Sequence, residues 1–572
     1  METFEASVTE LEKAVARLEA RVSALERAER VSFAASVDVP PPVAAESAVT
    51  DDRESQIALI GRTVVVLGGA YLLRAITDMS VVPRPAGVAL GLAYAIAWFV
   101  FADRSARAGA SLGAAMHALG GVLIAYPLLF EATHRFKVLS PEVGVLLLAI
   151  VTGAGITIAW RRSLRPMAWL VTIGAVLGGL LMLAETEAVF LHGIFFIALG
   201  VATVWASYVL DWFALRWMPA FVVDLVVAIV TLLAWQNKGG VDRDGVIALQ
   251  LILVVAYVGT FALRTIVRGR EVLPFEIAQT TAALVIGVGG AGLLSIGSPS
   301  VHFMLGVALA ALGLAAYGVA FVFIDRRGGS VQNFFFYSSV ALVLLFYGMT
   351  LVLPNGALTL ALGGIGIVAA LLADRFRKVT LSAHAATYLG GAALASGALA
   401  SSVMAFAFPF DTRWVPMAWD EWAIAALIGW SVWAIGAGSE EFQERAASPR
   451  LILLSLFVLT AAGILLHAVI ESGALASAPA LAACRTGVLA IAAVLLALGA
   501  HHRRLAITRA LVYPVLILGA VKLTIEDLRL GTPLTLFVAF ALYGGALIVA
   551  PRLRKRGKWA TALGAPSQQS RT

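Results

Sequence analysis

Apolar runs of about twenty residues, each long enough to cross a bilayer as a helix, follow one another from Ile57 to Ala550. They lack the alternation of apolar and polar positions that the strands of a membrane barrel require. Helices are then the remaining way to satisfy the backbone hydrogen bonds in lipid. The pattern predicts an all-α, polytopic integral membrane protein.

We expect about 18 membrane helices, paired as hairpins that cross the bilayer and return. Their expected bounds are 57–76, 86–102, 110–131, 140–160, 166–184, 188–210, 218–236, 245–263, 275–297, 301–324, 331–353, 356–373, 380–407, 421–437, 451–470, 478–500, 507–528 and 532–550. They define a transmembrane domain over residues 57–550, and residues 551–572 are expected to be a basic, disordered tail in the cytoplasm.

Basic residues are unevenly distributed between the loops that join these segments. Arginines concentrate in every second loop, for example at Arg161-Arg162 and Arg503-Arg504, whereas the loops between them hold few or none. Loops rich in arginine and lysine stay in the cytoplasm, so both termini are expected there. A missed or additional helix would invert every later loop and remove the asymmetry, which therefore favours an even number of helices.

The first 56 residues have a different pattern. Valine and leucine alternate at a spacing of four and three, in the order that favours parallel dimers. Residues 1–30 are therefore predicted to form a short coiled coil, and residues 31–56 a flexible linker rich in proline and alanine. A homodimer or homo-oligomer formed through residues 4–28 is one interpretation, and a single amphipathic helix is the other. The heptad positions are Phe4, Val8, Leu11, Val15, Leu18, Val22 and Leu25.

Composition agrees with a membrane location and excludes several classes of soluble protein. Hydrophobic residues make up 60% of the chain and charged residues 13%, beyond the usual range of soluble domains. The net charge of +7 does not indicate nucleic-acid binding, because the basic residues lie in short loops between apolar runs. Cys484 is the only cysteine, which excludes an internal disulfide and a multi-cysteine metal site. We expect no metal and no cofactor, and the chain contains no P-loop and no H-E-x-x-H motif.

Arg485 is the most informative charge, because it lies about 6 Å along the axis from the midpoint of the span predicted over 478–500. An ionisable group at such a depth costs about 2.5–3.5 kcal/mol on insertion scales, so it should face protein and have an acidic or carbonyl partner. A polar cavity beside it would favour contact with an anion or a lipid headgroup. A carboxylate beside it would favour a structural ion pair.

Four further charges are binding or gating candidates. Asp224 and Arg62 lie at similar depths in two predicted spans and form a candidate pair. Lys522 and Glu526 are four residues apart, a spacing that places both on one face of a helix as a local ion pair.

The longest outer loop, over about 408–420, leads into two adjacent carboxylates, Asp420 and Glu421. They are weak catalytic candidates, as a base or a metal-binding dyad that acts on a lipid-linked sugar. Carboxylates at a helix start also interact favourably with the helix dipole, which is the competing explanation.

The first predicted hairpin resembles a bacterial family of polytopic membrane proteins, the domain of unknown function 2339. The resemblance lies in the stretch from Gly69 to Arg74, in Val88–Leu92, and near the end in Lys522-Leu523 and Asp527-Leu528. It implies a multi-pass protein of the bacterial inner membrane that begins with a coiled coil. The turn at Gly178-Gly179 departs from the family, because no Thr-Pro follows it. The family has no established activity, so the resemblance implies a topology and no mechanism.

Three hypotheses about function follow. A transport-class protein that moves an unidentified solute or lipid-linked molecule is preferred, because membrane helices dominate the chain. An outward-facing enzyme for lipid-linked envelope precursors would lose function when Asp420 and Glu421 become amides. A membrane scaffold that assembles partners through its coiled coil would lose function when residues 1–30 are removed. Catalysis is the less favoured option, because the soluble part is too small to be catalytic.

Overall fold

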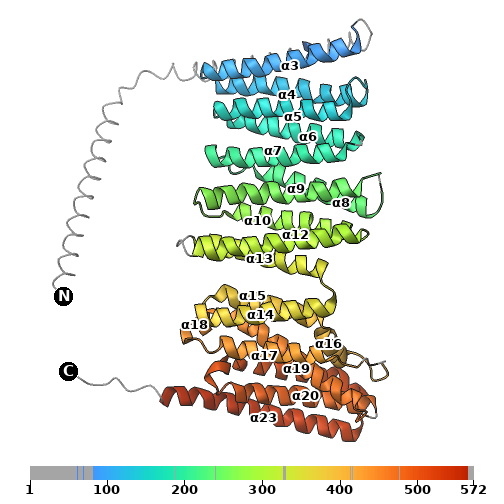
Figure 1. The fold of residues 1–572 in the computed structure, drawn as a ribbon, viewed down its shortest axis with the longest axis vertical. Coiled ribbons are helices and arrows are strands. Elements are labelled where there is room, and N and C mark those ends of the chain that lie inside the picture. Colours follow the sequence, from blue (N-terminus) through green and yellow to red (C-terminus); the bar gives the residue numbers. More distant parts are fainter. Residues whose placement is uncertain are drawn as a thin grey trace, which may run out of the picture. The chain divides into compact units, whose positions relative to one another are not determined.

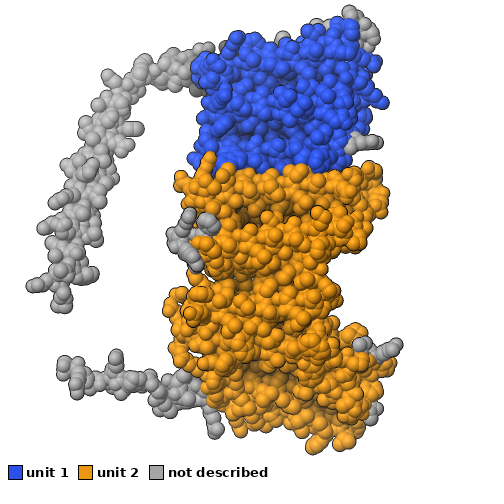
Figure 2. Space-filling model, viewed as in Figure 1, with its two compact units in different colours: residues 1–223 blue, residues 224–572 orange. Residues whose placement is uncertain are grey.

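The computed structural model describes Gly61, Gly68, Gly69 and residues 82–563, apart from residues 187, 239, 326–329, 413, 415 and 476. The regular structure of this part is helical and contains no strand. The predicted coiled coil, the linker, and all but three residues of the first predicted span lie outside the described residues. The chain divides into two compact units, residues 1–223 and 224–572, each described by itself (Figure 2).

Unit 1 is built from long helices joined by short turns. Helix α3 packs against α4, and α6 packs against both α4 and α5. Consecutive helices run back and forth beside one another (Figure 1). The bounds are α3 (Arg84–Arg107), α4 (Ser111–His134), α5 (Pro141–Arg161), α6 (Arg165–Glu185) and α7 (Val189–Leu210), and α8 (Trp217–Trp235) contains the boundary between the units.

Helix starts in both units follow from local sequence. Proline occupies one of the first two positions of several helices, including Pro141 in α5 and Pro166 in α6, where no intrahelical N–H donor is needed. The Ser140 hydroxyl accepts a hydrogen bond from the backbone N–H of Val143 and caps α5. Proline and serine at these positions therefore mark where the helices begin.

Unit 2 also consists of helical hairpins, with α12 packed on α13 and α14 packed on α15. Its elements are α9 (Arg243–Ala262), η1 (Leu263–Val267), α10 (Pro274–Ala283), η2 (Leu284–Gly289), α11 (Gly290–Ser295), α12 (Pro299–Gly318), η3 (Val319–Asp325), α13 (Val331–Val352), α14 (Asn355–Phe376), α15 (Val379–Ala395), α16 (Ala398–Ala407), α17 (Trp419–Ile435), α18 (Glu440–Arg445), α19 (Ala447–Glu471), α20 (Ala478–Gly499), η4 (Arg503–Ala510), α21 (Val512–Lys522), η5 (Leu523–Asp527), α22 (Leu528–Leu530) and α23 (Pro533–Leu563). Segments η1, η2, η3 and η5 are π-helical, and such turns occur often at functional sites.

One predicted span is broken. Helices α15 and α16 are bent by 68° relative to each other. Gly397 lies at the break with φ of 89°, a left-handed conformation that glycine adopts without a steric cost. Helix α16 then packs tightly on α19, because a Cβ at Gly463 would lie 2.3 Å from the Cβ of Ser402. The predicted segment 380–407 is therefore two helices rather than one.

The helices leave large apolar side chains exposed all along the two units. Leu534, Phe537, Met304 and Val255 are each at least two-thirds exposed. A soluble protein rarely exposes apolar surface on this scale, whereas lipid-facing helices require it. The chain is a multi-pass membrane protein.

Fifteen of the described helices are long and apolar enough to cross a membrane, or up to 16 if the bent pair α15–α16 is one span. Every predicted span after the first overlaps a helix or a run of consecutive helical segments. Helix α17, which matches the span predicted over 421–437, has 17 residues and is not among these fifteen. The first predicted span, 57–76, lies largely outside the described residues, so the total of 18 stays a prediction.

Candidate functional site

The C-terminal end of α16, helix α20 and segment η5 of unit 2 meet around Arg485. Helix α20 begins where the Ser477 hydroxyl accepts a hydrogen bond from the backbone N–H of Ala480, with Pro479 in its first turn. Small residues around Arg485, including Ala482 and Gly487, allow neighbouring helices to approach closely. Arg485 therefore lies inside the protein, with 3% of the residue exposed.

Arg485 has both kinds of partner that the sequence predicts for it. Its Nη1 donates to Glu526 Oε1 at 2.6 Å, and its Nε donates to the carbonyl oxygen of Ala405 at 2.8 Å. Its Nη2 donates to the carbonyl oxygen of Phe408. All three guanidinium nitrogens are thus engaged, which satisfies a charge that would otherwise be costly to bury.

The two carbonyl groups belong to the end of α16 and the residue that follows it. The last carbonyls of a helix have no partner within the helix, and they carry the negative end of its dipole. Here the guanidinium of Arg485 donates hydrogen bonds to these carbonyl groups and places a positive charge at the negative end of the helix dipole. The short helix α16, which follows the break at Gly397, is held at its far end by a buried cation.

Lys522 supplies the second cation of the site. Its Nζ donates to Asp527 Oδ2 at 2.7 Å, to Thr486 Oγ1 at 2.9 Å and to the carbonyl oxygen of Ala482. Its distance to Glu526 Oε2 is 3.5 Å. The local pair predicted between Lys522 and Glu526 is present, and Asp527 is the closer carboxylate.

The π-helical segment η5 explains why Lys522 and Asp527 can meet. In an α-helix, residues five apart lie about 140° from each other around the axis, at about 100° per residue. A π-helix bonds residues five apart along its backbone and so places them over one another. The wider turn over Leu523–Asp527 brings Asp527 toward Lys522. Asp527 also accepts a hydrogen bond from Thr486 Oγ1 at 2.7 Å, which ties η5 to α20.

We call Arg485, Lys522, Glu526 and Asp527, with Thr486, the four-charge cluster. Its two cations and two carboxylates balance, and their side chains are between 3% and 21% exposed. Asp527 and Thr486 were not among the predicted site residues. The five-residue spacing of Lys522 and Asp527 hides their pairing from any pattern based on α-helical periodicity. Because the nearest charge to Arg485 is a carboxylate, the geometry favours a structural ion pair.

Asp224 lies elsewhere in unit 2 and is 8% exposed. Its Oδ1 accepts a hydrogen bond from Gln279 Nε2 at 2.9 Å, so its described partner is an amide on α10. The arginine predicted as its partner, Arg62, lies outside the described residues.

A second buried ion pair in unit 2 was not predicted. Arg264 Nη1 lies 3.0 Å from Glu276 Oε1, and Glu276 is fully buried. Glu276 Oε2 also accepts the backbone N–H of Leu273 at 2.8 Å at the start of α10. Glu276 is the second residue of the span predicted over 275–297. Carboxylates are common at a membrane interface, so this position did not indicate a buried ion pair.

The predicted carboxylate dyad lies in the first turn of α17. Glu421 is 6% exposed, and its Oε1 accepts the backbone N–H of Ala418 at 3.3 Å. That contact caps the helix that contains Glu421, as the helix-dipole explanation expects. Within the described residues, no group of three or more His, Cys, Asp or Glu side chains is placed to hold a metal ion.

No protein-family model matches the sequence, and no curated protein matches it. The resemblance to domain of unknown function 2339 therefore stays a prediction, and the arguments that follow rest on the geometry of this chain.

Proposed function

We propose that this membrane protein is of the transport class and moves an unidentified solute or lipid-linked molecule across the bilayer. One observation carries the proposal: the span broken at Gly397 ends in carbonyl groups that a buried arginine holds. Transporters commonly use discontinuous helices whose ends provide unpaired backbone groups within the membrane.

The ion pair of Arg485 and Glu526 is structural in the state described above, and in this proposal it is also the gate, which is closed in that state. Movement of Glu526 away from Arg485 would leave a guanidinium that can bind the carboxylate or phosphate of a substrate in its place. Glu526 lies on a π-helical segment, a departure from the α-helix that is frequent at functional sites. The gate is therefore located where the backbone of the last hairpin is already distorted.

Reconstitution of the full chain in proteoliposomes tests the proposal. A panel of anionic solutes and lipid-linked molecules would be added outside, and substrate-dependent flux and proton movement would be measured. Wild-type protein is expected to show flux with at least one member. Glu526→Gln removes the charge that closes the gate, so it is expected to change the flux markedly.

The matched control is Glu444→Gln, which removes the charge of an exposed carboxylate in α18. This variant is expected to transport as the wild type does. Wild-type protein that moves neither solute nor protons over a broad panel would overturn the proposal. If Glu526→Gln and Glu444→Gln changed the flux equally, the four-charge cluster would have no specific part in transport.

The alternatives named from the sequence have less support. Glu421 has a capping contact that accounts for its position without catalysis. The coiled coil on which a scaffold would depend lies outside the described residues. Both stay hypotheses, and transport is preferred because the broken helix and its buried arginine lie within the membrane domain.

A further inference from the structure

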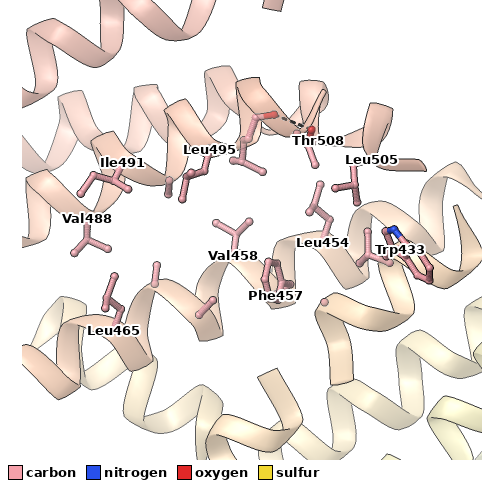
Figure 3. A pocket seen from close by; sticks show the side chains of 17 residues that line it. Trp433, Leu454, Phe457, Val458, Leu465, Val488, Ile491, Leu495, Leu505 and Thr508 are labelled. Carbon is pink, nitrogen blue, oxygen red and sulfur yellow. Dashed lines mark hydrogen bonds between the residues drawn. The ribbon is translucent and has the colours of Figure 1, made fainter. Parts of the chain in front are cut away.

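An apolar groove runs between α19 and α20 in unit 2. Its volume is about 390 Å³, within the usual ~300–1,000 Å³ range of ligand-binding pockets. Figure 3 shows Val458 and Leu465 facing Ile491 and Leu495 across it. Thr508 is the only residue of the lining with a hydroxyl group, and that group is occupied in a 2.7 Å hydrogen bond to the carbonyl oxygen of Leu496. Apart from the indole N–H of Trp433 at one end, the groove thus offers an occupant apolar contacts.

The length of the groove distinguishes a lipid acyl chain from a membrane helix of a partner protein. Its lining extends along α20 from Val488 to Gly499 and along α19 from Leu454 to Leu465. Each stretch rises about 17 Å, at about 1.5 Å per residue. That is roughly half of the ~30 Å hydrocarbon core, the depth of one leaflet. A membrane helix of a partner would need the full thickness, whereas an acyl chain needs one leaflet.

One end of the groove lies at Trp433, Leu505 and Thr508 (Figure 3). Trp433 lines this end, and the guanidinium of Arg504 lies 4.1 Å from the centre of its ring. Arg503, His501 and His502 are exposed in the same turn, and no acidic residue occurs between Gly499 and Lys522. An aromatic ring under a cation at the end of an apolar span is typical of the headgroup level of a membrane.

On the N-terminal side of the other wall, which is the side of the basic turn, the nearest acidic residues in sequence lie in α18. Glu440, Glu441 and Glu444 are exposed, and Glu441 is paired with Arg445 at 2.5 Å. None of the residues that line the groove has a carboxylate. The charge at its end is therefore set by the arginines of the turn from His501 to Arg504.

We propose that this groove binds one anionic phospholipid, with an acyl chain between α19 and α20 and its phosphate at Arg503 and Arg504. The apolar lining, the one-leaflet length and the basic end each match one part of that molecule. Clusters of basic residues at the cytoplasmic ends of membrane helices bind such headgroups in the same way. The site is separate from the four-charge cluster and does not depend on the transport proposal.

Native mass spectrometry of the delipidated full chain in detergent tests the proposal. The protein would be titrated with phosphatidylglycerol and, in parallel, with phosphatidylcholine that has identical acyl chains. Wild-type protein is expected to retain one tightly bound phosphatidylglycerol and to prefer it over phosphatidylcholine. Arg503→Gln with Arg504→Gln should reduce this preference by about fivefold for each arginine removed. Removal of two arginines from another basic turn, Arg161→Gln with Arg165→Gln, should leave it unchanged.

A second pair of variants tests the apolar part. Ala492 lines the groove, and Ala492→Trp should fill it and abolish retention of the lipid. Ala308→Trp adds the same side chain at an exposed position of α12, and this variant should still retain the lipid. Ala461→Phe, on the opposite wall, replaces Ala492→Trp if that variant is not monodisperse.

Two results would overturn the proposal. One is equal retention of lipid by Ala492→Trp and Ala308→Trp. The other is a wild-type dimer without bound lipid that Ala492→Trp converts to a monomer, because the groove would then hold a second copy of the chain.

Discussion

The two units use charge in different ways. In the described part of unit 1, Asp103 is paired with Arg107 and Arg162, whose side chains are 63% and 32% exposed. In unit 2, by contrast, the side chain of Arg485 is 4% exposed and that of Glu276 is fully buried. Unit 1 also has one buried arginine, Arg216, but its described ion pairs join exposed helix ends. Unit 2 has exposed pairs such as Glu441–Arg445, and in addition it has ion pairs with buried members.

This difference bears on where an activity can reside. A buried charge is costly, so it persists only where its partners satisfy it or where a function requires it. Unit 2 also contains the broken span α15–α16 and the π-helical segment that carries Glu526. Irregular backbone and buried charge therefore occur together in the second unit, which makes that unit the place to look for a substrate path.

The largest effect is expected for Arg485→Met. The change leaves Glu526 and the carbonyl groups at the end of α16 without their guanidinium partner. Loss of one partner of a buried ion pair typically costs about 3–5 kcal/mol. Unfolding of the detergent-solubilised protein, followed by circular dichroism, should show a loss of stability of that order.

The double variant Arg485→Met, Glu526→Met serves as the control. Replacing both members of a buried pair by apolar groups is often far less costly than removing one. The double variant should therefore be more stable than Arg485→Met alone. A single variant as stable as the wild type would show that the pair contributes nothing to the fold.

An intermediate effect is expected for Glu276→Gln. Glu276 accepts hydrogen bonds from Arg264 and from the backbone N–H of Leu273, and the amide keeps an acceptor but loses the charge. A hydrogen bond to a charged group contributes about 1.5–3 kcal/mol, so a loss within that range is expected in the same unfolding measurement. Glu444→Gln, at an exposed position, should change stability by less than about 0.5 kcal/mol. Equal effects of the two substitutions would contradict a special role for burial.

Much of the membrane architecture could be predicted from the sequence, because span length and apolarity depend on the local chain alone. Arg485 could be singled out for the same reason, since its depth follows from its place in one span. The identity of its partner could not, because Glu526 and the end of α16 reach it only through packing between distant helices. The hydrophobic pattern also does not indicate the break at Gly397, because the residues on both sides of it are mainly apolar.

Asp527 shows a second limit. Sequence periodicity assumes an α-helix, and in an α-helix Lys522 would face Glu526 rather than Asp527. The π-helical turn changes that register, and nothing in the local residue types of Leu523–Asp527 indicates it. Pairings that depend on a locally altered helix therefore become visible only in three dimensions.

The smallest effect is expected for Asp103→Asn in unit 1. Asp103 Oδ2 lies 2.6 Å from Arg107 Nη2, and Oδ1 lies 2.7 Å from Arg162 Nε, so the amide loses both ion pairs but keeps one acceptor. Exposed pairs contribute about 0–1 kcal/mol, because water and salt screen them. The variant should unfold within about 1 kcal/mol of the wild type, and the difference should shrink further at about 1 M salt, where screening acts within about 3 Å. A loss as large as that of Glu276→Gln, unchanged by salt, would mean that unit 1 also depends on desolvated charge, and the contrast between the units would fail.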